Sequence, residues 1–383
     1  MGTILFLLFL LLAGLLLVAS LYYLFALYAA WRLFRKVPPS AAPLPPVSIF
    51  KPLKGAPKNL YANLASFCRL DYPVFQLLCG VRDLHDPAVT VVQRLQRDFP
   101  ECDIALIVNP EIIGNNNKVS TLHHLSLAAR HDIFVITDGD VRVQPDYLRA
   151  IIPPLTDPEV GLITCPYRSH MTTRVPAFVE SLLINTVFTS LVLVASQVEK
   201  TSYAFGATIA VKRRCLEQIG GFATLADYLA DDYYLGYLVT QAGYQAQIVP
   251  HVVETRPGVS TFGELFHHQL RWARTQRTCR PAGYFGTLVI YGTVWALLGL
   301  AAFWPSPLMR ALALITVSLR LVSTAVVGKM FLRTSRTLRT LWLVPVTDVL
   351  SFLVWCLSLR GNRVRWGEHT FRVQRDGKMA PAG

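Results

Sequence analysis

The sequence lacks the patterns that define disulfide-rich, zinc-binding and nucleic-acid-binding proteins. Its 383 residues include seven cysteines, an odd number, and no two of them form a Cys-x-x-Cys pair. This spacing offers neither a disulfide framework nor a zinc site, so we expect the thiols to behave as small hydrophobic groups in a reducing compartment. An RNP motif and an extended stripe of lysine and arginine are also missing, so nothing indicates binding to nucleic acid.

Charged residues are scarce, at 16%, whereas hydrophobic residues make up 52% of the chain. The mean hydropathy of +0.39 is too high for a soluble protein, and the apolar excess lies at the two ends. The net charge is nevertheless +13. Because many of the basic residues flank apolar segments, an anionic membrane surface and a phosphate-bearing substrate explain this charge best.

The first segment is expected to be a transmembrane helix over residues 1–31, since residues 4–30 carry no charge and about 20 apolar residues span a bilayer. A cleaved signal peptide is the alternative, but basic residues would then precede a shorter apolar run. Here they follow it, as Arg32 and Arg35, which places the next domain in the cytosol. Residues 32–46 are expected to form a proline-rich linker.

Residues 47–280 are predicted to form one α/β domain. Strand-like and helix-like stretches alternate over residues 47–140 at a spacing typical of βαβ units and a mostly parallel sheet. The helices are expected over residues 60–70 and 87–98 and from the cap at 115–118 to residue 130, and a strand that contains a glycine is expected over residues 203–211. Residues 177–196 are strongly apolar but are interrupted by Glu180 and Asn185. We expect a helix lying in the membrane interface there, as the floor of a site reached from the lipid, with a buried core helix as the alternative.

Residues 281–359 are predicted to return to the membrane, and a basic tail follows over residues 360–383. Three full crossings would place that tail outside the cytosol, against the rule for basic residues. The conflict disappears if residues 341–358, which contain Pro345 and Asp348, form a re-entrant or interfacial helix. Arg320, in the middle of a candidate segment, faces either a polar interior or a bound anion.

Asp138 and Asp140 follow a run of four strand-favouring apolar residues, 133–136. Ligands of open α/β sheets bind beyond the carboxyl ends of the strands. Two carboxylates there form a hard-oxygen site for Mg²⁺ or Mn²⁺, which takes substrate phosphates as further ligands. The alternative is an Asx turn that caps a helix starting near Pro145.

Further acidic residues are expected at strand ends or helix starts of the same domain, namely Asp83 and the pair Asp231 and Asp232. Transfer from a sugar diphosphate needs such a set: one group for the nucleotide, a pair for a metal and one general base. A basic helix adds His268, Arg271 and Trp272, and an arginine fork suits phosphate. Adjacent histidines on a helix diverge by about 100° per residue, so the two His-His pairs are not expected to bind metal.

In this order, these residues resemble the ceramide glucosyltransferase-like group of the GT-A glycosyltransferases, in families 21 and 2. The matching elements are the Lys-Pro-Leu loop at Lys51, the Asp83 and Asn-Lys118 elements, the Asp138-x-Asp140 pair, Asp232, and the Gln/Arg-x-x-Arg-Trp motif at residues 268–272. The resemblance implies an inverting hexosyltransferase that uses a UDP-sugar and a divalent metal. It implies that Asp83, Lys118, Lys51 and Asp138 bind the donor, Asp138 and Asp140 the metal, and that Asp232 is the base, with Arg271 and Trp272 over the diphosphate.

His268 departs from the motif, which usually opens with glutamine or arginine, so its role is left open. Forms with histidine resemble bacterial members that glycosylate hopanoids. The acceptor implied is therefore a hopanoid polyol such as bacteriohopanetetrol, or ceramide, and the location implied is a bacterial inner membrane. A processive polysaccharide synthase and a non-catalytic lipid- or nucleotide-binding membrane protein are the alternative functions. The sequence indicates no oligomeric state.

Overall fold

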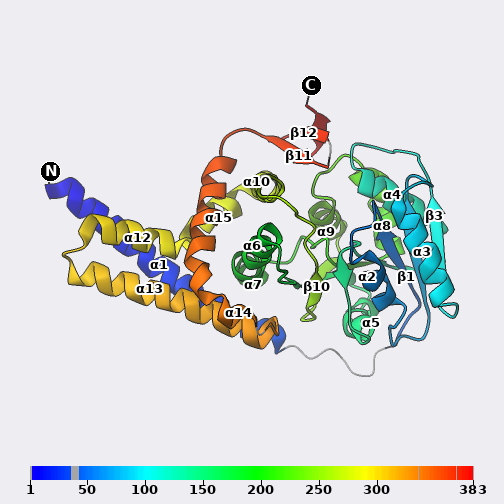
Figure 1. Cartoon of the computed structure of the whole chain (residues 1–383), viewed down its shortest axis with the longest axis horizontal. Coiled ribbons are helices and arrows are strands. Elements are labelled where there is room, and N and C mark those ends of the chain that lie inside the picture. The colour runs from blue at the N-terminus through cyan, green and yellow to red at the C-terminus, as the bar shows by residue number, and fades with distance from the viewer. Residues whose placement is uncertain (1, 36–42, 335, 368, 383) are drawn as a thin grey trace. The chain divides into compact units, whose positions relative to one another are not determined.

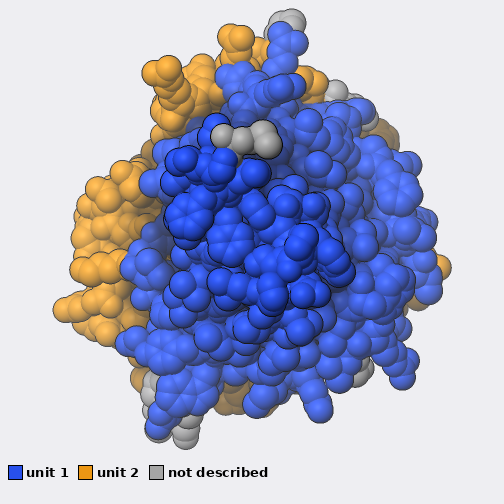
Figure 2. Space-filling view, turned by 90° about the vertical axis from the view of Figure 1, so that its left-hand side faces the viewer, with its two compact units in different colours: residues 1–35, 171–199, 259–366 blue, residues 36–170, 200–258, 367–383 orange. Residues whose placement is uncertain are grey.

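The computed structural model describes residues 2–35, 43–334, 336–367 and 369–382. The described residues form two compact units, which Figure 2 distinguishes by colour. Unit 1 comprises Met1–Arg35, Met171–Glu199 and Val259–Trp366, and unit 2 comprises Lys36–His170, Lys200–Gly258 and Gly367–Gly383. The domain expected over residues 47–280 thus contributes residues 171–199 and 259–280 to unit 1. Of the expected linker over residues 32–46, residues 36–42 lie outside the described residues.

Unit 2 is built on a mostly parallel seven-stranded sheet in the order β3-β2-β1-β4-β8-β6-β9. The first four strands are mutually parallel, and only β8 runs antiparallel to its two neighbours. This arrangement confirms the predicted fold class. The strands are β1 (Val47–Pro52), β2 (Phe75–Val81), β3 (Ile104–Val108), β4 (Ile133–Ile136), β6 (Val160–Thr164), β8 (Ile209–Lys212) and β9 (Gln245–Ile248).

Both faces of this sheet are buried. Successive side chains of a strand point to opposite faces, and each face packs against its own apolar cluster. In β4, Val135 belongs to one apolar cluster and Phe134 to the other. The first cluster contains residues of α2 (Leu60–Phe67), α3 (Pro87–Asp98) and α5 (Tyr147–Ile151), and the second contains residues of α4 (Asn117–Ala128), α8 (Arg213–Gln218) and α9 (Asp231–Gln241). The carboxyl ends of β1, β2 and β4 are thereby left as the accessible edge for chemistry.

Two smaller features of unit 2 differ from expectation. The strand expected over 203–211 is only Ile209–Lys212, since Phe205 and Thr208 form an isolated bridge around Gly206 instead. The basic tail is not merely a charged extension, because β12 (His369–Val373) and β13 (Met379–Pro381) pair as an antiparallel hairpin. Met379 of this hairpin bonds through its backbone to Asp227 and to the side chain of Asn115. A short ladder, β5-β10-β7 (Val141–Arg142, Val253–Thr255, Tyr167–Ser169), completes unit 2.

Unit 1 is formed mainly by apolar helices (Figure 1). Four of its helices are long and apolar enough to cross a membrane: Gly2–Phe34, Val175–Val198, Pro307–Phe331 and Leu341–Ser358. A fifth candidate is the pair Pro281–Ile290 and Gly292–Phe303, which bends by 52°. The individual elements are α1 (Gly2–Phe34), α6 (Val175–Leu183), η2 (Ile184–Phe188), α7 (Thr189–Val198), α10 (Phe262–Cys279), α11 (Pro281–Gly286), η4 (Thr287–Ile290), α12 (Gly292–Phe303), α13 (Pro307–Val326), η5 (Val327–Phe331), α14 (Arg336–Arg339), η6 (Leu341–Leu343), α15 (Val344–Ser358) and the strand β11 (Arg363–Trp366).

The helix expected near residues 177–196 spans α6, η2 and α7 without a break. Of its most apolar window, 67% is buried inside the protein, against 22–39% for the other three long candidates. This burial favours the alternative of a packed helix, while its depth in a membrane stays a prediction. Glu180 and Asn185, which interrupt its apolar pattern, are both buried and therefore face protein.

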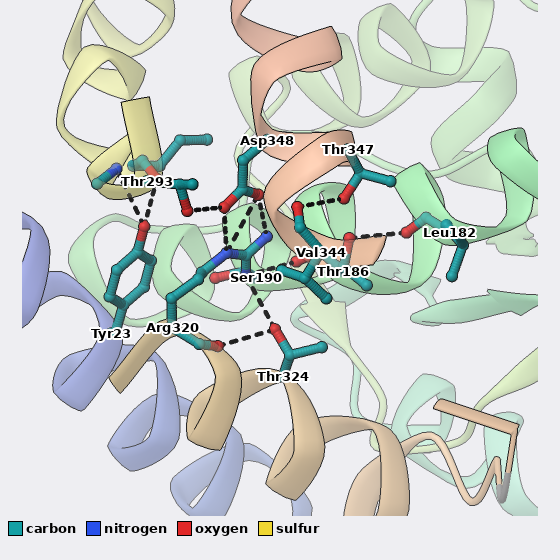
Figure 3. A network of polar contacts seen from close by, with 12 residues as sticks. Tyr23, Leu182, Thr186, Ser190, Thr293, Arg320, Thr324, Val344, Thr347 and Asp348 are labelled. Atoms are coloured by element: carbon teal, nitrogen blue, oxygen red, sulfur yellow. Dashed lines mark hydrogen bonds and ion pairs between the residues drawn. The ribbon is translucent and has the colours of Figure 1, made fainter. Parts of the chain in front are cut away.

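Arg320 of α13 faces a polar interior, the first of its two expected environments (Figure 3). Its guanidinium donates to the Asp348 carboxylate of α15 at 2.7 and 3.1–3.2 Å, and to the Thr186 carbonyl at 3.2 Å. Thr293 donates to the same carboxylate at 2.6 Å. The adjoining cavity of about 10 Å³ is about the size that one water molecule needs. Asp348 is therefore a compensated charge, and its presence no longer argues that residues 341–358 fail to cross the membrane.

Breaking this pair should destabilise unit 1. In Arg320→Met, the Asp348 carboxylate stays buried without its main partner, and removing one member of a buried pair costs about 3–5 kcal/mol. The double variant Arg320→Met with Asp348→Leu should recover much of that loss, because no charge is left buried. Thermal unfolding of the three proteins in detergent measures this. Equal midpoints for Arg320→Met and the parent would contradict it.

Candidate active site

The loop after β4 is fixed by hydrogen bonds that other residues donate to three of its backbone carbonyl groups. Lys51 of β1 donates from Nζ to the Asp138 carbonyl at 3.0 Å, and Asn63 donates to the Gly139 carbonyl at 3.2 Å. The backbone amide of Arg256 donates to the Asp140 carbonyl at 3.1 Å. These bonds come from three elements and fix the direction in which the carboxylates of Asp138 and Asp140 leave the sheet.

The alternative of a helix cap at this loop is wrong. The following helix begins at Tyr147, with Asp146 at its N-cap. The Asp138 carboxylate instead accepts from Lys118, with Oδ1 2.9 Å from Nζ. The Asp138 carboxylate thus belongs to a cluster of charged side chains beyond the end of β4.

Lys118 joins two acidic segments that are distant in the sequence. Its Nζ lies 2.9 Å from Asp138 and 3.4 Å from Asp231 Oδ2. Burial alone would lower the pKa of Lys118, but the charges of Asp138, Asp231 and Asp232 raise it above its usual value. Asn116 caps α4 by accepting from the Val119 amide at 3.1 Å, which places Lys118 in the first turn of that helix. The lysine is therefore a permanently charged centre of the site.

Asp232 is the second residue of α9. Its carboxylate accepts from the backbone amides of Gly206 and Tyr233, both at 2.8 Å. Burial and the neighbouring charge of Asp231 raise the pKa of Asp232 to about 6, against the opposing effect of Lys118. A carboxylate with this pKa is ionised at neutral pH but is more basic than usual, which suits a general base.

Lys51 supports the site from within the core. Its side chain is fully buried, and its Nζ lies 3.6 Å from the centroid of the Phe67 ring. Burial lowers the pKa of Lys51 to about 7. In place of the donor contact that the resemblance implies, we assign Lys51 to holding the Asp138 loop.

Asp140 and Asp83 complete the edge. Burial and the charge of Asp138 raise the pKa of Asp140 to about 7, although Lys51 opposes this. Asp83 lies two residues after β2 and is exposed, with Oδ1 accepting from the His85 amide at 2.9 Å. Because β2 and β4 are both parallel neighbours of β1, Asp83 lies at the same edge of the sheet as Asp138.

The residues at this edge are suited to a divalent metal whose remaining coordination positions are filled by a ligand. Gly206 leaves space between the acids, since a Cβ there would lie 3.3 Å from Asp232 Oδ2 and 3.4 Å from Asp138 Oδ2. No cluster of three or more histidine, cysteine or acidic side chains that could hold a metal occurs among the described residues. Two carboxylates with phosphate oxygens as the other ligands are a normal set for Mg²⁺ or Mn²⁺. Asp138 and Asp140 would supply those carboxylates.

The predicted basic helix is α10 of unit 1, so its residues are described separately. His268 Nδ1 forms an ion pair with Glu180, whose side chain is 2% exposed. The His268 ring meets the Trp272 ring edge to face at a centroid distance of 4.5 Å, and the Arg271 guanidinium lies 5.9 Å from the centroid of the Trp366 ring. The histidine that departs from the motif is thus a partner of a buried glutamate, and buried acidic groups need such a partner.

Two residues of these arrangements, Arg256 and Glu180, were not among the predicted site residues. Asp231, which was expected with Asp232 as an acidic pair, lies beside Lys118. Arg256 borders Asp140, and its buried Nε has no hydrogen-bond partner among the described residues. Neither Arg256 nor Glu180 belongs to a recognisable motif, because each acts through a partner far away in the chain. All seven cysteines are free, as predicted.

The fold and this edge of acidic residues define a GT-A glycosyltransferase. The mannosyltransferase PcManGT from Pyrobaculum calidifontis, solved with GDP-Man and Mn²⁺, has a similar fold, with a TM-score of 0.51 at 20% identity over 90% of this chain and 99% of that one. The model of glycosyl transferase family 21 matches residues 11–379, and the chain belongs to that family.

Curated relatives agree with this family. Ceramide glucosyltransferase 1 of Caenorhabditis elegans is 28% identical over 66% of this chain, and the match spans 54% of the relative's own length. Ceramide glucosyltransferase 3 of the same organism is 23% identical over 92% of this chain and 78% of the relative. The chain is thus a family 21 glycosyltransferase that contains helices long and apolar enough to cross a membrane.

Proposed function

We propose that the protein transfers a hexose or N-acetylhexosamine from a UDP-sugar to a hydroxyl group of a membrane lipid, with inversion at the sugar carbon. The observation that carries the proposal is the charge cluster of Asp138, Lys118, Asp231 and Asp232 around the space at Gly206. Such a cluster combines a cation for a diphosphate, Lys118, with a carboxylate of raised basicity, Asp232. Membership of family 21 supports sugar transfer as its use.

Asp232 is the general base in this proposal. As the acceptor oxygen forms a bond to the anomeric carbon, its proton passes to the Asp232 carboxylate. The bond from that carbon to the diphosphate oxygen breaks, and UDP leaves with the electron pair. The backbone amides of Gly206 and Tyr233 hold the carboxylate in place, which is the fixed geometry that a positioned base needs.

The donor is held by the edge beyond β2 and β4. Asp83 is exposed there to hydrogen-bond the uridine, and Lys118 offers its charge to the phosphates. Asp138 and Asp140 would hold Mg²⁺ or Mn²⁺, which neutralises the departing diphosphate when bound. Arg271 and Trp272 of α10 are assigned by family resemblance to the same diphosphate, and His268 is assigned to positioning Trp272 through their ring contact.

The acceptor is a lipid of the membrane in which unit 1 lies. The candidate spans of unit 1 and the names of the curated relatives support ceramide, and the histidine at position 268 supports a hopanoid polyol. We propose the inner membrane of a bacterium as the location, with unit 2 in the cytosol where UDP-sugars occur.

Mass spectrometry of total membrane lipids tests this function. Cells that express the protein should contain a lipid whose mass exceeds that of a parent lipid by one hexose or N-acetylhexosamine. Cells that express the Asp232→Asn variant at the same level serve as the control and should lack it. Identical lipid profiles in the source organism with and without the gene would overturn the proposed function.

A further inference from the structure

A second cavity lies entirely within unit 1, apart from the cluster of acidic residues. It is an open pocket of about 70 Å³ between the helix of residues 175–198, α10 and α15. One water needs about 10–15 Å³ on this measure, so the pocket admits several non-hydrogen atoms but not a whole lipid. Its walls are mainly aliphatic and aromatic, and they include Val187, Phe188, Gln269, Trp272 and Val354.

One residue of the pocket wall, Gln269, carries a buried polar atom without a hydrogen-bond partner. Nε2 of Gln269 is shielded from solvent and makes no hydrogen bond to any residue that the structure describes. Leaving a buried donor unsatisfied is unfavourable, so such atoms usually mark a ligand or water site. Gln269 lies between His268 and Arg271 in the chain, at a position that the family motif does not specify.

The pocket wall on the opposite side has unusual helical geometry. Residues 184–188 form a π-helical turn, in which the Thr189 amide donates to the Ile184 carbonyl five residues earlier. Turns of this kind occur frequently at functional sites. This turn places Val187 and Phe188 on the pocket, and the Phe188 ring lies 6.2 Å from the ring of Trp272.

We propose that this pocket binds the hydroxyl-bearing end of the acceptor lipid, with Gln269 donating a hydrogen bond from Nε2 to a lipid oxygen. The inference rests on the proposed function. An apolar wall with one buried donor matches the boundary between the headgroup and the chain of a lipid, and it does not match a nucleotide or a free sugar. Trp272 lines the pocket and also belongs to the motif that family resemblance assigns to the donor diphosphate.

Two variants separate this role from general damage. Gln269→Leu removes the donor at similar volume, and Val354→Trp fills the pocket from α15. The matched control is Leu353→Trp, because Leu353 is the preceding residue, is 50% exposed and does not line the pocket. Each protein is purified into vesicles made from total lipids of the source organism. Transfer from UDP-glucose and UDP-N-acetylglucosamine is then measured while lipid and donor concentrations are varied separately.

Gln269→Leu should raise the KM for lipid by about threefold to tenfold, the loss of one hydrogen bond, with the KM for the donor within twofold of the parent value. Val354→Trp should lose at least tenfold in kcat/KM for lipid, and Leu353→Trp should behave like the parent. Unchanged lipid kinetics in both pocket variants would overturn the proposal that the pocket binds the acceptor lipid. Equal losses in Leu353→Trp and Val354→Trp would overturn it as well. An absence of transfer by the parent protein would instead overturn the proposed function on which the pocket rests.

Discussion

Asp232→Asn should lower the turnover of sugar transfer by roughly 10²–10⁴-fold, the usual contribution of a general base. The amide cannot accept the proton of the acceptor hydroxyl. It can still accept a backbone hydrogen bond in place of the carboxylate that now binds the Gly206 and Tyr233 amides, so the start of α9 should keep its structure. Binding of UDP, measured by calorimetry, should therefore remain close to that of the parent.

Asp231→Asn is the matched comparison, because Asp231 is adjacent and acidic but contacts Lys118 through its carboxylate. It should lose less turnover than Asp232→Asn and should weaken UDP binding through a less firmly held lysine. Near-normal turnover in Asp232→Asn would contradict the assignment of the base. A larger loss in Asp231→Asn would move that role to the neighbouring residue.

Asp138→Asn is expected to act on the donor instead. The change removes a carboxylate from the metal set and the 2.9 Å partner of Lys118. Loss of such an electrostatic contact to the leaving group typically costs roughly 10²–10³-fold in rate. We expect kcat/KM for the UDP-sugar to fall by that factor, the activity to require more Mn²⁺, and the affinity for UDP in the presence of Mn²⁺ to fall with it.

Asp146→Asn is the control for this experiment. Asp146 follows in the same connection, is exposed, and makes no side-chain cap to α5, so its loss should leave the activity and its dependence on Mn²⁺ unchanged. The same dependence on Mn²⁺ in Asp138→Asn and in the parent would contradict a metal-binding role for Asp138.

The part of the fold that the sequence predicts well is the part with short-range signals. The run Ile133–Ile136 contains only strand-favouring apolar residues before Asp138, and it is a buried strand with parallel and antiparallel partners. The periodic apolar helices that follow β1, β2 and β3 are also found. Such patterns indicate both the type of element and its buried face, so they can be interpreted without knowledge of the tertiary structure.

The part that could not be predicted depends on partners far apart in the chain. Nothing near His268 indicates Glu180, and nothing near Arg320 indicates Asp348, yet each pair decides how a charge is buried. A charge inside an apolar segment therefore predicts that some partner exists without identifying it. The strand expected at residues 203–211 failed for a related reason, because Gly206 is placed by Asp232 and not by pairing along the strand.

The anomeric configuration of the transferred sugar tests the central claim most directly. UDP-glucose and UDP-N-acetylglucosamine carry the sugar in the α configuration, and one displacement assisted by a single base inverts it. The coupling constant of the anomeric proton in the NMR spectrum of the purified glycolipid should therefore show a β-linked sugar. An α-linked product would contradict the account, because retention would require a second displacement that Asp232 as the only base does not provide.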